Sequence, residues 1–326
     1  MVSESFVHAC AGGAGGLVAM TATYPLMAIS TRAAVDRSKH PGESVAHAVT
    51  KVLATEGFLG LYDGLSSSLV AIGVSNFVYY FFFEASRDFI LTSKRLATHS
   101  QNAALLSSSL STLESIMAGL LSGTATAMIS NPIWVVNTRQ TVRGTHIKTN
   151  PDGTPVPKTV EKRLSFLQTF RHIVRKDGVL ALWRGLGPAL VLVTNPVLQY
   201  TVFEQLKAWL MKNRTRARAA AGSTKPLLGD LDFFWLGALS KLVATAVTYP
   251  QIVIKSRQQA ISSDQPAGKR VNVWTAMTDV VHDEGFRGLY RGLSSKLLQS
   301  ILTAAILFAS KERIYNMTKT AVAGPK

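Results

Sequence analysis

A pair of short motifs occurs three times in this chain of 326 residues and constrains its fold more than any other feature. The first motif places a proline seven residues before an arginine, and it reads TYPLMAISTR at 23–32, SNPIWVVNTR at 130–139 and TYPQIVIKSR at 248–257. The second motif joins an acid-Gly pair to an aromatic residue and a further glycine, and it reads EGFLGLYDG at 56–64, DGVLALWRG at 177–185 and EGFRGLYRG at 284–292. Two motifs that alternate three times at constant internal spacing indicate three structural repeats.

Each first motif lies in an apolar stretch that is long enough to cross a membrane. The first two stretches read FVHACAGGAGGLVAMTATYPLMAI and SIMAGLLSGTATAMISNPIWVV, and a third opens with FFWLGAL. A helix needs about 20 apolar residues to span the hydrocarbon core, and a helix satisfies its own backbone groups in lipid. A second apolar stretch follows each second motif. The sequence therefore predicts six transmembrane helices in three pairs, with a short amphipathic stretch such as 43–57 in each connection.

The repeats are predicted at 1–95, 108–213 and 228–320, and together they form one six-helix transport domain. The polar segments LTSKRLATHSQN and MKNRTRARAAAGSTKP separate them. A proline in a helix interior removes a hydrogen bond at a cost of about 3 kcal/mol, so a recurring proline inside a span predicts a functional kink. The three kinks are expected at Pro25, Pro132 and Pro250.

The charge of the chain indicates an anionic partner, because 35 Lys+Arg against 19 Asp+Glu give a net charge of +16. Basic residues lie in the connections and no nucleic-acid-binding motif occurs, so we expect an anionic solute and anionic lipids rather than nucleic acid. Cys10 is the single cysteine, which excludes a disulfide framework and a multi-cysteine metal site. Without a Walker loop, paired catalytic carboxylates or a metal cluster, no enzyme, cofactor or metal ion is predicted.

The chain resembles the mitochondrial carrier family, whose signature is Pro-x-acid-x-x-base-x-base followed by acid-Gly-x4-aromatic-base-Gly. The resemblance covers residues 6–318, and the stretches YPLMAISTR, NPIWVVNTRQ and LYRGLSSKLLQSILTAA are most similar to the peroxisomal branch that carries ATP, AMP, CoA or NAD. It implies an all-α membrane protein, a monomeric six-helix barrel of pseudo-threefold symmetry, with a central substrate site, alternating access and a short amphipathic helix on the non-cytosolic side of each repeat.

The function implied by this resemblance is exchange of nucleotide-type anions across the peroxisomal membrane. Two alternatives stay open. One is a nucleotide or cofactor carrier of the mitochondrial inner membrane, and the other is a non-transporting membrane scaffold or receptor with a carrier fold.

The chain departs from the family at the gate away from the cytosol. The family closes that gate with a ring of ion pairs between an acid two residues after each proline and a base five residues after it. The acid positions here hold Met27, Trp134 and Ile252, and the base positions hold Ser30, Asn137 and Lys255. We expect closure by apolar contacts and hydrogen bonds with Trp134 as a plug, or Trp134 as ordinary interface packing. Gln259 matches a glutamine brace of the family.

The arginines that end the first motifs are Arg32, Arg139 and Arg257. They stand two residues after the base positions, about 200° around a helix. We therefore expect them to contact lipid head groups or loops rather than the gate.

The cytosolic gate of the family resembles a second recurring pattern, aromatic-acid-x-x-base. It occurs as FEASR at 83–87 and FEQLK at 203–207, while KERIY at 311–315 keeps Glu312 but ends in tyrosine. If each acid pairs with the base of the next repeat, Glu84 pairs with Lys207 and Glu312 with Arg87, which leaves Glu204 with the tyrosine. The alternative is ordinary interfacial charges worth about 0–1 kcal/mol each.

Charged residues inside the spans are candidate substrate ligands, because a charge in the membrane interior is costly. Lys241 occupies a position that holds glycine in the other two repeats. It lies one helical turn from Thr245. Lys296 and Gln299 lie three residues apart, hence on one helix face, and alignment with the family places Gln299 at the central contact point. Two lysines with an amide suit phosphate groups.

A polar and aromatic stripe is a candidate site for an adenine ring. It includes Asn195 and Gln199 in the fourth span, which is one residue shorter than its equivalents, and Tyr79 in the second span. These side chains offer amide hydrogen bonds and a stacking face. Helix packing is the alternative role for the stripe.

Overall fold

The computed structural model describes residues 4–36, 45–97, 110–142, 164–221, 228–261 and 272–306, and all regular structure in these ranges is helical. The long helices are α1 Glu4–Val35, α3 Leu65–Ala97, α5 Thr112–Val142, α8 Asn195–Ala221 and α9 Asp230–Ala260. The short helix α7 Leu186–Leu192 precedes α8, and a further helix covers 293–306. Four stretches of the described chain are long and apolar enough to cross a membrane, namely Phe58–Lys94, Thr112–Val142, Val179–Thr215 and Leu231–Ala260.

A short helix follows each of the three proline-containing helices. The short helices are α2 Val45–Glu56, α6 Phe166–Asp177 and α10 Val273–Glu284, of 12 residues each. Each leads into a 3-10 helix of five residues, η1 Phe58–Tyr62, η3 Val179–Trp183 and η4 Phe286–Tyr290. The second motif therefore folds in the same way three times, which is the structural form of the repeat read from the sequence.

The two glycines of the second motif bound each 3-10 helix and have positive φ. Gly57 has a φ of 72° and Gly64 a φ of 88°, and the equivalent glycines in the other repeats also fall between 73° and 82°. Glycine adopts this region at little cost because it has no Cβ. These turns place each 3-10 helix against the proline-containing helix of its repeat.

An apolar cluster fixes the short helix of each repeat to the proline-containing helix. Every cluster takes one residue four positions after the proline, one from the short helix and one from the 3-10 helix: Ile29, Val52 and Leu61; Val136, Ile173 and Leu182; Ile254, Val280 and Leu289. Full burial of such a side chain stabilises a fold by about 1.5–3 kcal/mol. The three clusters therefore hold the connections at one end of the bundle, which we call the proline end because the helices containing Pro25, Pro132 and Pro250 finish there.

The fourth span differs from the continuous helix that the sequence predicts. Between α7 and α8 the N–H groups of Val193 and Thr194 donate to carbonyls three residues back, at 3.2 Å and 3.1 Å. Pro196 has no N–H, so the helical hydrogen bond to the carbonyl of Leu192 is missing. The tighter turn occurs in the span that is one residue shorter than its equivalents.

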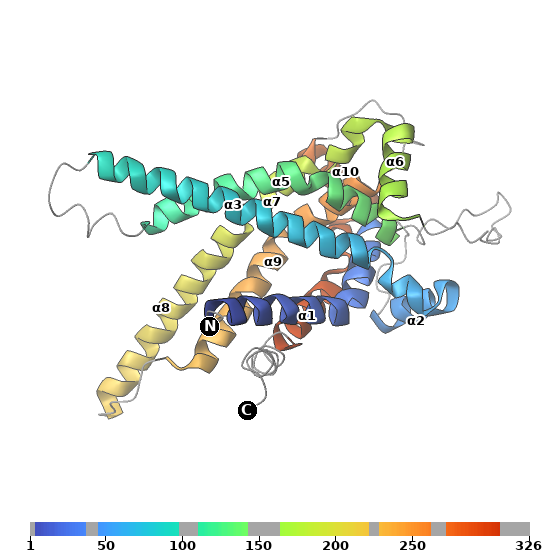
Figure 1. Cartoon of the computed structure of the whole chain (residues 1–326). Helices are drawn as coiled ribbons and strands as arrows, with labels where there is room; N and C mark the ends of the chain where they lie inside the picture. Colours follow the sequence, from blue (N-terminus) through green and yellow to red (C-terminus); the bar gives the residue numbers. More distant parts are fainter. Residues whose placement is uncertain are drawn as a thin grey trace, which may run out of the picture.

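Consecutive repeats are joined side by side at the end opposite the prolines. α3 packs along α5, and α8 packs along α9. Lys94 Nζ lies 2.6 Å from Glu114 Oε2, and Arg214 forms two contacts of 2.6 Å and 2.7 Å with Asp232. Figure 1 shows α3 and α8 diverging towards this end, away from α2, α6 and α10.

Candidate transport site

Three buried arginines connect the repeats at the proline end. Each donates from Nε to a backbone carbonyl nine residues after the proline of another repeat: Arg32 to Thr141 at 2.8 Å, Arg139 to Gln259 at 3.3 Å, and Arg257 to Ala34 at 2.9 Å. The direction is always from one repeat to the next, so the hydrogen bonds form a closed ring of the three helix ends.

Each of these arginines also pairs with the acid of the second motif in its own repeat. Arg32 makes two contacts of 3.0 Å with Glu56, Arg257 makes contacts of 2.5 Å and 2.9 Å with Glu284, and Arg139 pairs with Asp177. The arginines are only 6–9% exposed. The expectation of head-group contacts is therefore wrong, whereas the alternative of loop contacts is met in part, because Arg32 also donates to the carbonyl of Gly60 and Arg139 to that of Ile261. The threefold recurrence of an arginine followed by an acid-Gly pair was the sequence signal for this pairing.

The bundle is closed at the proline end by side chains of all three repeats. Val35, Val142 and Ala260, each ten residues after a proline, pack on one another in a buried cluster. Just inside it, Gln259 accepts a hydrogen bond from Thr138 at 2.9 Å and donates to Asn131 at 3.3 Å. This brace and cluster join the C-terminal ends of α1, α5 and α9.

Two of the three base positions of the family are neutral here and bond to a turn of another repeat. Ser30 Oγ donates to the carbonyl of Gly292 at 3.0 Å, and Asn137 Nδ2 donates to the carbonyl of Gly64 at 2.9 Å. A Cβ at Gly292 would lie 2.6 Å from the carbonyl oxygen of Ser30, so only glycine fits this approach. Hydrogen bonds to backbone thus stand where the family has ion pairs.

Trp134 contacts the helices on both sides of α5. Its indole N–H donates to Ser75 Oγ on α3 at 3.1 Å, and the Nζ atom of Lys255 on α9 lies 5.7 Å from the centre of the indole ring. The side chain therefore links three helices close to the proline end.

Three lysines of α9 and helix 293–306 lie within electrostatic range of one another, with Lys255 and Lys296 half-buried and Lys241 exposed. Lys296, on helix 293–306, interacts electrostatically with Lys241 and Lys255 of α9. In the described ranges no ion pair joins any of the three to an acid. Lys241, Lys255 and Lys296, hereafter the lysine cluster, therefore concentrate three positive charges in one region.

Polar side chains lie beside the lysine cluster on the same helices. Thr245 is buried on α9, one turn from Lys241. Gln299 is buried as well, and its Nε2 group donates to Thr303 at 3.2 Å. The amide oxygen of Gln299 is buried without a hydrogen-bond partner in the described part of the chain. This oxygen is an available acceptor next to Lys296.

The polar and aromatic stripe predicted from the sequence is divided in the structure. Asn195 Nδ2 donates to Thr248 Oγ1 at 2.5 Å and so connects α8 to α9. Gln199 is half-buried on the same helix. Tyr79 stacks on Phe83 with ring centres 6.0 Å apart.

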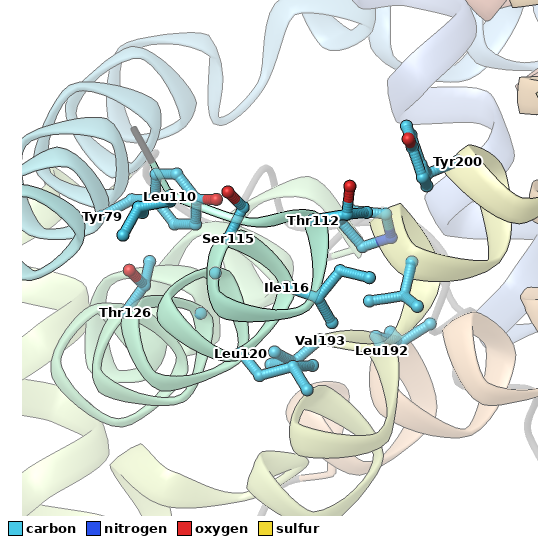
Figure 2. A pocket seen from close by; sticks show the side chains of 14 residues that line it. Tyr79, Leu110, Thr112, Ser115, Ile116, Leu120, Thr126, Leu192, Val193 and Tyr200 are labelled. Atoms are coloured by element: carbon cyan, nitrogen blue, oxygen red, sulfur yellow. The ribbon is translucent and has the colours of Figure 1, made fainter. Parts of the chain in front are cut away.

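Tyr79 also lines a cavity of about 540 Å³ between α3, α5 and the break between α7 and α8. Figure 2 shows Tyr79 and Tyr200 on opposite sides of it, with Thr112 and Ser115 of α5 between them. Asn195 and Gln199 do not line this cavity, although the sequence grouped them with Tyr79. The cavity was not predicted, because no motif in the sequence indicates the tighter turn between α7 and α8 that borders it.

The charged residues of the predicted cytosolic gate pair within their own helices. Arg87 lies 3.3 Å from Glu84, and Lys207 lies 3.7 Å from Glu204. The expected pair of Glu84 with Lys207 is not formed in this conformation, since the helices that carry them diverge (Figure 1). Glu312 lies outside the described residues.

Comparison with known proteins identifies the family. The model of the family described as mitochondrial carrier protein matches residues 2–94, 108–214 and 231–321. This chain belongs to the mitochondrial carrier family. The carrier is therefore a transport protein and not an enzyme, and its three repeats have the fold that the sequence motifs predict.

Similar carriers cover the whole chain. The carrier is 32% identical to peroxisomal membrane protein PMP34 of Mus musculus, over 98% of this chain and 95% of the relative. It is 31% identical to the peroxisomal nicotinamide adenine dinucleotide carrier of Arabidopsis thaliana (98% and 97%) and to peroxisomal membrane protein PMP47B of Candida boidinii (99% and 89%). These relatives confirm the expectation of a multi-pass carrier of the peroxisomal membrane.

Proposed function

We propose that this carrier exchanges nucleotide-type anions, namely ATP and AMP, CoA or NAD, by alternating access across the peroxisomal membrane. The observation that carries the proposal is the lysine cluster, which gathers three cations from two membrane helices. Charges within membrane-spanning helices are costly and are a functional site by default. Phosphate groups are the part that all these solutes share, and lysine binds phosphate as a compact point charge.

The residues around the cluster supply the rest of the site. Lys241 and Lys296 hold the phosphates, and the amide oxygen of Gln299 accepts a hydrogen bond from the sugar or base. Thr245 adds a hydroxyl on the face of Lys241. Tyr79, which lines the separate cavity bordered by α3 and α5, is assigned the stacking surface for the base.

Asn195 and Gln199 complete this assignment on the fourth span. The amide of Asn195 donates to Thr248 in this conformation, so its role in binding depends on a rearrangement of α8 against α9. Gln199 reaches the base without that change.

Alternating access requires that the diverging end closes when the proline end opens. We propose that Glu84, Arg87, Glu204, Lys207 and Glu312 form the closed gate by pairing between repeats. In that state the local contact of Glu84 with Arg87 is exchanged for contact with Lys207.

Charge reversal tests the gate. Glu84→Lys or Lys207→Glu alone is expected to lower the exchange rate about tenfold, because like charges then meet in the closed gate; the double variant is expected to recover most of the rate. The local pairs are exposed, and loss of an exposed pair costs about 0–1 kcal/mol. Initial rates of solute uptake into liposomes measure both effects. A double variant as slow as the slower single variant would contradict pairing between these residues.

A substrate panel tests the function itself. The full chain is reconstituted in liposomes loaded with ATP, AMP, CoA or NAD, and uptake of the labelled solute is measured against each internal solute. We expect rapid uptake only with a suitable internal solute. The binding site of an exchanger returns to the outer side only with an internal solute bound. Carrier that unfolds cooperatively on heating yet takes up none of the four contradicts the proposal and favours the non-transporting scaffold.

The location is tested separately, by fluorescence imaging of the tagged full chain against peroxisomal and mitochondrial markers. Mitochondrial labelling would favour an inner-membrane carrier without affecting the transport result.

A further inference from the structure

Lys255 is the member of the lysine cluster that also contacts the gate at the proline end. On one side its charge acts on Lys296. On the other side its Nζ atom lies 5.7 Å from the centre of the Trp134 ring. A cation at this distance from an indole face is attracted by the quadrupole of the ring. One side chain is therefore shared between the substrate region and a contact that joins two repeats.

The positions of the two partners show why this contact matters for closure. Trp134 lies two residues after Pro132 in the second repeat, and Lys255 lies five residues after Pro250 in the third. These are the positions at which the family signature has an acid and a base. The cation–π contact thus stands where an ion pair between these two repeats would stand.

The equivalent positions of the other repeats contain no second contact of this kind. Lys255 is the single cation among the three base positions, since the other two are Ser30 and Asn137. Both of those donate to backbone carbonyls of the turns at Gly292 and Gly64. Neither side chain carries a charge, so among these positions Lys255 alone is drawn to an anion by its charge.

We propose that the Lys255–Trp134 contact holds the proline end closed in the empty carrier and is released when a phosphate group of the substrate binds Lys255. The substrate class rests on the proposed function. The contact itself does not depend on it.

The physical reason for release is a change in the best partner of Lys255. In the empty carrier its ammonium group is repelled by Lys296, and the indole face of Trp134 offers it a favourable contact on the other side. A phosphate supplies a charge-assisted hydrogen bond, which is stronger than a neutral one, and it turns the repulsion among the lysines into shared attraction. A ligand shifts a conformational equilibrium only through its different affinity for the two states, and the contact of phosphate with released Lys255 supplies that difference.

Ser75 is a positioning residue in this arrangement. Its Oγ atom accepts the indole N–H at 3.1 Å and so orients the ring face. Trp134→Phe keeps an aromatic face but removes this hydrogen bond, whereas Ser75→Ala removes the acceptor and keeps the indole. Both variants therefore lack the hydrogen bond between positions 134 and 75, and only Ser75→Ala keeps the indole ring.

The first experiment measures the contact without any solute. Thermal unfolding of the purified full-length carrier is compared for Lys255→Gln in the wild type and in Trp134→Leu. A cation–π contact changes an equilibrium about two- to thirty-fold, so Lys255→Gln is expected to destabilise the wild type by such a factor and to have little effect beside Trp134→Leu. The coupling is expected to weaken but not disappear with Trp134→Phe and with Ser75→Ala, since each removes the hydrogen bond that orients the ring and each keeps an aromatic face at position 134. Equal effects of Lys255→Gln in both backgrounds would overturn the proposal.

Two controls keep this result interpretable. Lys212→Gln, at an exposed lysine of α8, is expected to show no coupling to position 134. Trp134→Met replaces Trp134→Leu if the leucine variant does not fold, because methionine fills more of the space of the indole without an aromatic face.

The second experiment measures release. Trp183, Trp209, Trp235 and Trp274 are replaced by phenylalanine, so that Trp134 is the only tryptophan, and its emission is followed during titration with ATP, CoA, NAD and pyrophosphate. We expect a saturable change that Lys255→Gln abolishes. Thermal stabilisation by a probe with unchanged Trp134 emission would overturn release. If no probe binds, the proposed function and the release step both fail, while coupling in the empty carrier is still decided by the first experiment.

Discussion

Arg32→Met is expected to destabilise the carrier by about 3–5 kcal/mol, the range for removal of one partner from a buried ion pair. The guanidinium makes two contacts of 3.0 Å with Glu56 and donates to the carbonyls of Thr141 and Gly60. Methionine replaces none of these bonds. The loss affects the repeat itself through Glu56 and the closed ring of helix ends through Thr141.

The measurement is thermal and denaturant unfolding of the purified carrier in mixed micelles. Arg32→Lys keeps the charge but not the planar fork of donors, so an intermediate loss is expected. Arg287→Met is the matched control, because Arg287 is an exposed residue of η4 and surface changes usually stay within about 0.5 kcal/mol. An Arg32→Met carrier within about 1 kcal/mol of the wild type would contradict the role assigned to the ring.

The parts of this fold that follow from local sequence were predictable. Spacing of apolar residues, the proline and the acid-Gly pair define the long helix, the short helix and the turn of each repeat. Their threefold recurrence defines the arrangement, because three equivalent units bury equivalent faces. Motifs of this kind therefore predict the helices and turns of a repeat and the contacts within that repeat.

Contacts between repeats were not predictable from the same motifs. The bond from Arg139 to the carbonyl of Gln259 joins residues 120 positions apart. Every residue has a backbone carbonyl, so the residue type does not indicate which carbonyl accepts the bond. Helical angle alone placed the arginines away from the gate residues, and it gave no information on the helix ends of the next repeat. The cavity beside Tyr79 was missed for a related reason, since it depends on a local change of helix winding near Pro196.

The candidate substrate site lies between these two cases. Lys241 and Lys296 were identified because charges in apolar spans are rare, and the structure brings them within electrostatic reach of each other. Lys255 was assigned to the gate from its position in the first motif. Its second relation, to the lysine cluster, appears only when α9 and helix 293–306 are placed together.

Loss of both Lys241 and Lys296 is expected to lower the rate of solute exchange about a hundredfold. A hydrogen bond to a charged group contributes about 1.5–3 kcal/mol, and each 1.4 kcal/mol corresponds to a factor of ten. Each single change to alanine is therefore expected to reduce the rate about 10- to 100-fold at low solute concentration. The double variant falls short of the product of the two factors, since the residues share one ligand.

Initial exchange rates in liposomes, measured below saturation with whichever of ATP, AMP, CoA or NAD the wild type transports, give these factors. Lys212→Ala, at an exposed site on α8, controls for the loss of positive charge as such. Lys→Arg at either site keeps the charge and is expected to retain part of the rate, whereas Lys→Gln keeps a polar side chain without the charge and is expected to lose the rate. Because the lysines of the cluster repel one another, removal of two of them is expected to stabilise the empty carrier while transport is lost. A Lys241→Ala, Lys296→Ala carrier that transports at the wild-type rate would place the phosphate site elsewhere in the bundle.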